Sequence, residues 1–189
     1  GAMYRVATFV ALQKETDDAK EIIEFIEKNP ISFMNGQKGQ EVLMGSENVT
    51  EVIRTNEVTN TVSKISAMTE IREFMVAEQQ RIAKNGGIIM DGRDIGTCVL
   101  PNAQLKIFLT ASVQVRAKRR YDELVEKGEC CDLAEIEKDI SERDYRDMHR
   151  EIAPLKAAED AVMLDSSELN IDEVVEAIYE YAKKAGLEA

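Results

Sequence analysis

The sequence lacks long apolar runs, and it has only three cysteines and one histidine. A membrane-spanning helix needs about 20 consecutive apolar residues, so we predict no membrane association. Cys98, Cys130 and Cys131 are odd in number and lack the spacing of zinc ligands, which is typical of a reduced, cytoplasmic protein. Cys130 and Cys131 are read as two loop thiols, with metal binding or redox sensing as the alternative. His149 has no evident nucleophile or metal partner and is predicted to lie at the surface.

Positive charge is also scarce. The chain carries 24 Lys and Arg against 36 Asp and Glu, a formal net charge of −12. Surfaces that bind nucleic acid need an excess of positive charge, so we predict no nucleic-acid partner. A local positive pocket for a small anion is still compatible with this balance.

What the sequence does contain is an alternation of helical and strand patterns. Helical patterns cover residues 6–14, 17–27, 51–64, 68–85, 113–126, 133–151 and 171–184, and strand-like runs cover 88–90, 105–110 and 161–165. Two shorter runs, 31–34 and 41–44, flank turn residues and predict an antiparallel hairpin. Strands that alternate with helices predict an α/β fold with a parallel sheet, and 189 residues suffice for one core and a small insert.

One stretch concentrates charged residues beside an apolar run. Ile88–Met90 leads directly into Asp91, Arg93 and Asp94. We predict a buried strand here, and ligands of parallel sheets gather beyond the carboxyl ends of the strands. A charge that close to a core strand is costly without a partner. The stretch therefore requires either a ligand or salt bridges, and the spacing leaves both readings open.

Arginines recur on two later helical patterns. Arg143 and Arg150 are seven residues apart and share one helix face, which could grip a phosphoryl group. The alternative is a solvated face with ion pairs such as Asp139–Arg143. Arg116 and Arg120 share a face of the preceding helix, before a polar loop. A loop flanked by two arginine-bearing helices is what a closing phosphate lid needs.

Several long segments occur in one order along the chain: Asp91–Thr97, Leu100–Ala103, Lys106–Ser112, Arg116–Arg120, and Glu142–Asp144 through Ala153–Leu155. Together they closely resemble bacterial cytidylate (CMP) kinases. Gly1–Arg5 looks like that family's first substrate-side segment, and residues 52–72 look like its nucleoside-binding insert. The resemblance covers essentially the whole chain.

The resemblance implies an α/β, nucleoside monophosphate kinase-like fold in three layers, with a parallel-sheet core, a small antiparallel and helical CMP-binding insert, and a lid. Residues 1–29, 86–119 and 152–189 would form the core, 30–85 the insert, and 120–151 the lid and the arginine-bearing helix after it. It further implies ATP and Mg²⁺ as cofactors and CMP or dCMP as substrate. We expect a cytoplasmic monomer.

The same resemblance assigns roles to individual residues. The base would be read by Ser63, Arg72 and Asp94, with Tyr4 also on the substrate side. The monophosphate would be held by Arg5, Arg93 and Arg150. Asp147 would meet the sugar hydroxyls, Arg143 the transferring phosphoryl group, and Asp91 a magnesium-bound water. Arg116 and Arg120 would face ATP. Arg93, Arg143, Arg150 and Asp91 would thus be the catalytic set.

The role implied for Asp94 carries a prediction about specificity. Its carboxylate can accept a hydrogen bond from the amino group of cytosine, where uracil presents a carbonyl. A mismatched buried polar group costs about 1–3 kcal/mol. We therefore expect CMP and dCMP to be preferred over UMP by roughly ten- to a hundredfold.

The sequence departs from the family in one respect. The motif Gly-x-x-x-x-Gly-Lys-Ser/Thr, whose backbone cradles the phosphates of ATP, occurs nowhere in the chain. We therefore expect a fragment without the family's N-terminal strand, loop and helix, inactive by itself. Two alternatives stay open: a non-catalytic module that binds a nucleotide or a partner, and a kinase for another monophosphate, which would need different base readers.

Overall fold

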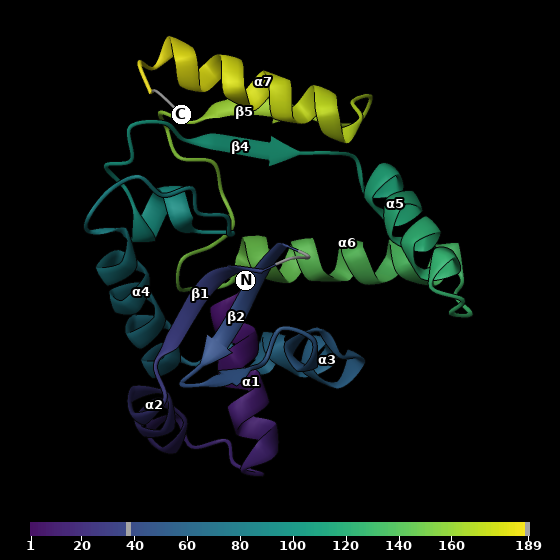
Figure 1. Cartoon of the computed structure of the whole chain (residues 1–189). Helices are drawn as coiled ribbons and strands as arrows, with labels where there is room; N and C mark the ends of the chain where they lie inside the picture. The colour runs from purple at the N-terminus through teal and green to yellow at the C-terminus, as the bar shows by residue number, and fades with distance from the viewer. Residues whose placement is uncertain (37–38, 188–189) are drawn as a thin grey trace. The chain divides into compact units, whose positions relative to one another are not determined.

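The computed structural model describes residues 1–36 and 39–187. The chain forms two compact units, unit 1 (Gly1–Asp91) and unit 2 (Gly92–Ala189), each with its own internal packing. In Figure 1 unit 1 runs from purple into blue-green, and unit 2 continues through green to yellow. Within the described ranges, no helix has the length and apolar character needed to cross a membrane.

Unit 1 is built around its first helix. Its elements are α1 (Ala2–Gln13), α2 (Ala19–Lys28), β1 (Ile31–Gly36), β2 (Gly39–Met44), β3 (Glu47–Asn48), the 3-10 turn η1 (Val52–Arg54), α3 (Asn56–Ile65) and α4 (Thr69–Ala83). The sequence of α1 is apolar on nearly every side, and Val6, Ala7 and Val10 are fully buried. A helix of this kind needs neighbours all round, and α1 packs on α2, α3, α4 and η1.

The predicted hairpin is present in unit 1. Strands β1 and β2 pair antiparallel from Ile31 opposite Met44 to Gly36 opposite Gly39, and the short β3 adds to β2. Val42 and Met44 alternate with more exposed positions and join the core of unit 1. This alternation is what a half-buried sheet requires. The predicted turn residues 37–38 lie outside the described residues.

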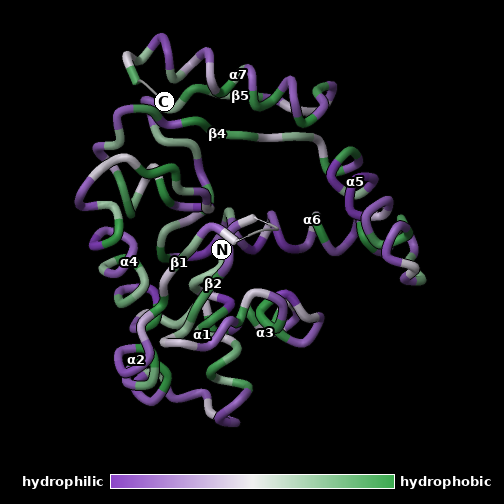
Figure 2. Tube along the Cα trace, in the orientation of Figure 1, coloured by the Kyte–Doolittle hydropathy of each residue, from purple (hydrophilic) through white to green (hydrophobic). Residues whose placement is uncertain are grey.

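Unit 2 holds the parallel strands. Its elements are the π-helical turn η2 (Ile95–Val99), β4 (Ile107–Thr110), α5 (Val113–Glu126), α6 (Leu133–His149), β5 (Val162–Asp165) and α7 (Ile171–Lys184). β4 and β5 pair in parallel from Ile107 opposite Val162 to Thr110 opposite Asp165. Figure 2 shows β4 as mainly hydrophobic and α6 as mainly hydrophilic. Most of α6 is therefore suited to present polar groups rather than to form core.

Side-chain caps set the starts of the unit 2 helices. The Ser112 hydroxyl accepts from the backbone N–H of Val115 at the start of α5. Asp132 caps α6 in the same way, and Asn170 and Glu173 form a reciprocal capping box at α7. Each cap satisfies a backbone N–H that the helix itself cannot pair.

The predicted strand at Ile88–Met90 is wrong for this structure. The segment has no regular secondary structure, and Ile89 is 98% exposed. An extended segment becomes a strand only when a neighbour pairs with its backbone, and no described strand pairs with this one. Within the described residues the parallel sheet consists of β4 and β5 alone, so the three-layer core implied by the resemblance stays a prediction.

The apolar core is unevenly distributed. The main cluster of buried apolar residues lies in unit 1, with Ile22, Ile53, Ile65, Ile71 and Met75 at 2% exposure or less. Unit 2 instead leaves many large apolar side chains exposed: Leu109, Val125, Leu133, Tyr145, Met148, Ile152, Met163, Ile171, Val175 and Tyr179. Burial of apolar area is the main source of folding stability. Unit 1 therefore contributes more of the folding stability than unit 2.

Candidate functional site

Arg5 is fixed by the turn that precedes α3. Its Nη1 donates to the carbonyl of Ile53 and to the hydroxyl of Thr59, both at 2.9 Å. Ile53 is 1% exposed, so the accepting carbonyl belongs to a residue of the unit 1 core. The guanidinium of Arg5 therefore lies along α3, on the turn before Ser63.

Arg72 lies close to Tyr4 in the same unit. Its guanidinium carbon is 5.6 Å from the centre of the Tyr4 ring, and its Nη1 donates to the carbonyl of Ser66 at 3.1 Å. The hydroxyl of Ser66 in turn donates to the carbonyl of Ser63 at 3.3 Å. Arg72 and Tyr4 are 4% and 8% exposed, whereas Ser63 is exposed. Unit 1 thus brings together all four of the predicted substrate residues that precede residue 90, including Arg5.

In unit 2, Asp147 of α6 lies between two of the predicted phosphate-binding arginines. Arg93 Nε donates to one carboxylate oxygen of Asp147, and Arg150 Nη1 is 3.7 Å from the other. Arg150 Nε also donates to the carbonyl of Ala153 at 2.5 Å. Ala153 has a φ of +49°, a left-handed backbone that is unusual for a residue with a side chain. The loop after α6 is therefore shaped so that a carbonyl meets Arg150.

The other arginines of unit 2 differ in how they are held. Arg116 donates from Nη1 and Nη2 to the two carboxylate oxygens of Asp144, and Arg120 donates to Glu123 on its own helix. No hydrogen bond or ion pair of the Arg143 side chain is found in the part of the chain that the structure describes. The alternative pair Asp139–Arg143 is thus not formed in this structure.

The two carboxylates of the charged stretch differ in burial. Asp94 is 6% exposed, and its carbonyl accepts from the backbone N–H of Cys98 in η2 at 2.8 Å. Asp91 is exposed. Burial of an ionised carboxylate is costly unless polar groups surround it, so Asp94 is built into the fold and Asp91 is open to solvent.

Glu123 is the one carboxylate bonded to a predicted site residue whose pKa clearly shifts. Hydrogen bonds from Lys127 and then from Arg120 lower the pKa of Glu123 below its ordinary value of 4.5. The charged form is favoured because both donors are cations. The positive charge of Arg120 is therefore partly neutralised by a carboxylate on its own helix.

Comparison with known proteins identifies the family. The family model described as cytidylate kinase matches residues 1–184. The chain belongs to the cytidylate kinase family. A cytidylate kinase of Lactococcus lactis subsp. lactis (strain IL1403) is 78% identical over 184 residues, which are 97% of this chain and 84% of that relative. A cytidylate kinase of Lactococcus lactis subsp. cremoris (strain MG1363) is 67% identical over the same coverage, and one of Streptococcus pyogenes serotype M6 (strain ATCC BAA-946 / MGAS10394) is 55% identical over 187 residues, 97% of this chain and 83% of that relative.

In this member of the cytidylate kinase family, the groups that hydrogen-bond the predicted arginines are also part of the candidate site. Sequence reasoning missed three of them: Thr59, Asp144 and the carbonyl of Ala153. Thr59 precedes Ser63 by one helical turn, so spacing could have suggested it. Asp144 pairs with Arg116 of another helix, so no local spacing points to it. The carbonyl of Ala153 carries no such signal because it depends on backbone conformation.

The family implies ATP use, and Mg²⁺ stays a prediction from the resemblance; the residues present fit the two groups in part. ATP would supply the phosphoryl group, and the charge of Arg143 is available to it. Arg116 and Arg120 would have to exchange a carboxylate for a phosphate. Within residues 1–36 and 39–187 no group of three or more His, Cys, Asp and Glu could hold a metal. Asp91 is exposed and would meet Mg²⁺ through water, as the resemblance predicts, because Mg²⁺ keeps waters and uses few carboxylates.

Proposed function

We propose that this chain binds CMP or dCMP and serves the ATP- and Mg²⁺-dependent phosphorylation of that nucleotide to the diphosphate. The observation that carries the proposal is Asp147 between Arg93 and Arg150 in a chain of the cytidylate kinase family. A carboxylate between two guanidinium groups occupies the place of an anion, and Arg is the side chain best suited to grip a phosphate.

The proposed chemistry needs positive charge and alignment rather than a covalent intermediate. In phosphoryl transfer the protein mainly positions the reactants and stabilises charge on the equatorial oxygens. We assign Arg5, Arg93 and Arg150 to the monophosphate of CMP and Arg143 to the group in transfer. Asp147 would take the sugar hydroxyls, so a bound nucleotide would replace its pairing with the arginines.

The base would be read by Ser63, Arg72 and Asp94, with Tyr4 beside Arg72. The burial of Arg72 and Asp94 supports this role, because a polar group discriminates strongly only where water cannot replace a missing partner. The functional division into core, insert and lid given by the resemblance belongs to the same proposal, as do the monomeric state and the absence of a nucleic-acid partner.

Calorimetric titration of the 189-residue chain with CMP and UMP tests the proposal. We expect CMP to bind roughly ten- to a hundredfold more tightly, and Asp94→Asn to bring the two affinities close together, because an amide can donate as well as accept. Asp139→Asn, an exposed change on α6, is the matched control and should keep the preference. Equal affinities in the unmodified chain would contradict the proposal.

We further propose that transfer by these 189 residues alone is slow. The Gly-x-x-x-x-Gly-Lys-Ser/Thr motif is absent from the printed sequence, and its loss removes the backbone cradle for the β-phosphate. Loss of one preorganised donor costs about a hundred- to a thousandfold in rate. A coupled assay with ATP and CMP should therefore show little turnover while calorimetry still reports CMP binding.

A further inference from the structure

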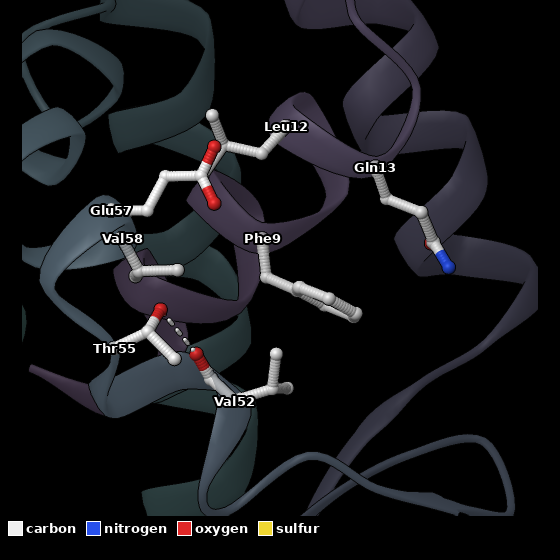
Figure 3. Close-up of a pocket in the computed structure, with 7 residues that line it drawn as sticks. All are labelled: Phe9, Leu12, Gln13, Val52, Thr55, Glu57 and Val58. Atoms are coloured by element: carbon white, nitrogen blue, oxygen red, sulfur yellow. Dashed lines mark hydrogen bonds between the residues drawn. The ribbon is translucent and has the colours of Figure 1, made fainter.

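Unit 1 contains a cavity that none of the proposed nucleotide contacts uses. It has a volume of about 260 Å³ and lies between α1, η1 and α3. Its lining residues, drawn in Figure 3, are Phe9, Leu12, Gln13, Val52, Thr55, Glu57 and Val58. Ligand pockets usually measure about 300–1,000 Å³, so this cavity suits a small molecule.

The lining has an apolar base and a polar rim whose charge is negative. Val58 is 2% exposed and forms part of the base, with Phe9 partly buried beside it. The rim carries the carboxylate of Glu57 and the amide of Gln13, and among the described residues no lysine or arginine lines the cavity. In Figure 3 the Glu57 carboxylate is directed toward Leu12 of α1. An occupant would therefore meet apolar surface on one side and negative charge on the other.

The polar groups of the rim are available to a ligand. In the described part of the chain, neither the Glu57 nor the Gln13 side chain makes a hydrogen bond or ion pair. The Thr55 hydroxyl donates to the carbonyl of Val52 at 2.9 Å, which leaves its oxygen free to accept. A ligand that donates hydrogen bonds would find acceptors here and no competing cation.

We propose that this cavity is a second binding site, for a small organic cation such as an aromatic primary amine. Its ammonium group would meet Glu57 and the Thr55 oxygen, and its ring would lie against Phe9 and Val58. A cation and an aromatic ring also attract each other directly. The acidic balance of the chain, −12 overall, favours cations over anions at such a site.

The site is separate from the proposed nucleotide contacts but adjoins one of them. Phe9 follows Arg5 by one turn of α1, and Val52 and Thr55 flank the segment whose Ile53 carbonyl holds Arg5. No lining residue is among the proposed contacts to CMP or ATP. Binding of the amine can therefore be measured without any nucleotide, and its outcome is independent of the proposed kinase activity.

The experiment uses ¹⁵N-labelled full chain and follows backbone amide shifts at low ionic strength. The titrants are benzylammonium, its neutral isostere benzyl alcohol and the anion benzoate. We expect saturable shifts that centre on residues 52–58 and the end of α1 for benzylammonium. Benzyl alcohol should bind about fivefold more weakly, the upper range for an exposed ion pair, and benzoate more weakly still.

Variants assign the effect to one carboxylate. Glu57→Gln should lower the benzylammonium affinity about fivefold, to that of benzyl alcohol. Glu51→Gln, an exposed change nearby that does not line the cavity, should leave it unchanged. Both positions are exposed, and the spectra themselves report whether each variant is folded. Absence of saturable shifts in the unmodified chain, or an unchanged affinity in Glu57→Gln, would overturn the proposal.

Discussion

Arg116 of α5 grips Asp144 of α6 with both terminal nitrogens, at 3.1 Å from Nη1 to Oδ1 and 2.6 Å from Nη2 to Oδ2. Its Nε also donates to the carbonyl of Ala111 at 2.9 Å, so one side chain joins the end of β4 to both helices. The two side chains are only 34% and 20% exposed, which makes the pair stronger than a fully solvated ion pair. A lysine at this position could supply the positive charge but not the two parallel hydrogen bonds of a guanidinium.

We therefore predict that Arg116→Lys loosens the packing of α5 on α6 by about 1 kcal/mol. Hydrogen exchange of the α5 and α6 amides measures this as roughly fivefold faster opening. Lys118→Gln is the control, because the pair of Lys118 with Asp122 lies within α5 and is exposed. The same exchange rates in both variants would show that the fork contributes nothing.

Asp147→Asn should separate phosphate binding from nucleotide binding. The carboxylate of Asp147 neutralises Arg93 and Arg150, so its removal should raise the affinity for inorganic phosphate about fivefold at low salt. CMP should gain less, since an amide is a weaker acceptor for the ribose hydroxyls than a carboxylate. Calorimetry with both ligands measures the ratio, and an unchanged phosphate affinity would contradict the pairing.

Two isoleucines offer a matched test of where stability resides. Ile71 of α4 is fully buried in the unit 1 core, whereas Ile171 of α7 is 82% exposed. Ile71→Ala should lower the free energy of unfolding by about 2–5 kcal/mol, because it removes buried apolar area and leaves a cavity. Ile171→Ala should change it by less than about 0.5 kcal/mol. Urea denaturation followed by circular dichroism compares the two, and equal losses would contradict the assigned core.

The acid response of α5 follows from the lowered pKa of Glu123. Lys127 and Arg120 hold the charged carboxylate, so its contribution is complete above the ordinary pKa of 4.5 that the unfolded chain shows. It is lost as the pH falls through the lower pKa of the folded state. Carboxyl NMR titration should give a midpoint below 4.5, and Lys127→Gln should raise it. An unchanged Glu123 midpoint in Lys127→Gln would show that Lys127 does not cause the lowered pKa.

The helices were the most predictable part of the fold. Helix α7 spans Ile171–Lys184 and α5 spans Val113–Glu126, both as their sequence patterns predicted, and Asn170 and Ser112 cap their starts. His149 lies at the surface, as expected, where its ring stacks on Tyr145 at 4.0 Å between centroids. Such features depend on residues close together in the sequence, so periodicity and capping chemistry suffice to find them.

The irregular backbone at Ile88–Met90, where a strand was predicted, and the turn η2 were not predictable in the same way. An apolar run specifies that a segment prefers burial, but a strand also needs a paired backbone, which only tertiary structure supplies. The candidate site also has a part that the sequence predicts and a part that it does not. The family resemblance named Arg93, Arg150 and Asp147, whereas the pairing of Arg116 with Asp144 joins two helices and has no local pattern. The roles of the named residues toward CMP and ATP stay predictions.

The left-handed backbone of Ala153 lowers stability, but it also places the carbonyl that Arg150 contacts. Glycine adopts that conformation without the penalty of roughly 1 kcal/mol that alanine meets there. Directed evolution for heat resistance alone would therefore be drawn to glycine at position 153. The freer loop would then aim its carbonyl at Arg150 less often. Heat-selected lineages should thus gain melting temperature while the Arg150 side chain becomes less ordered.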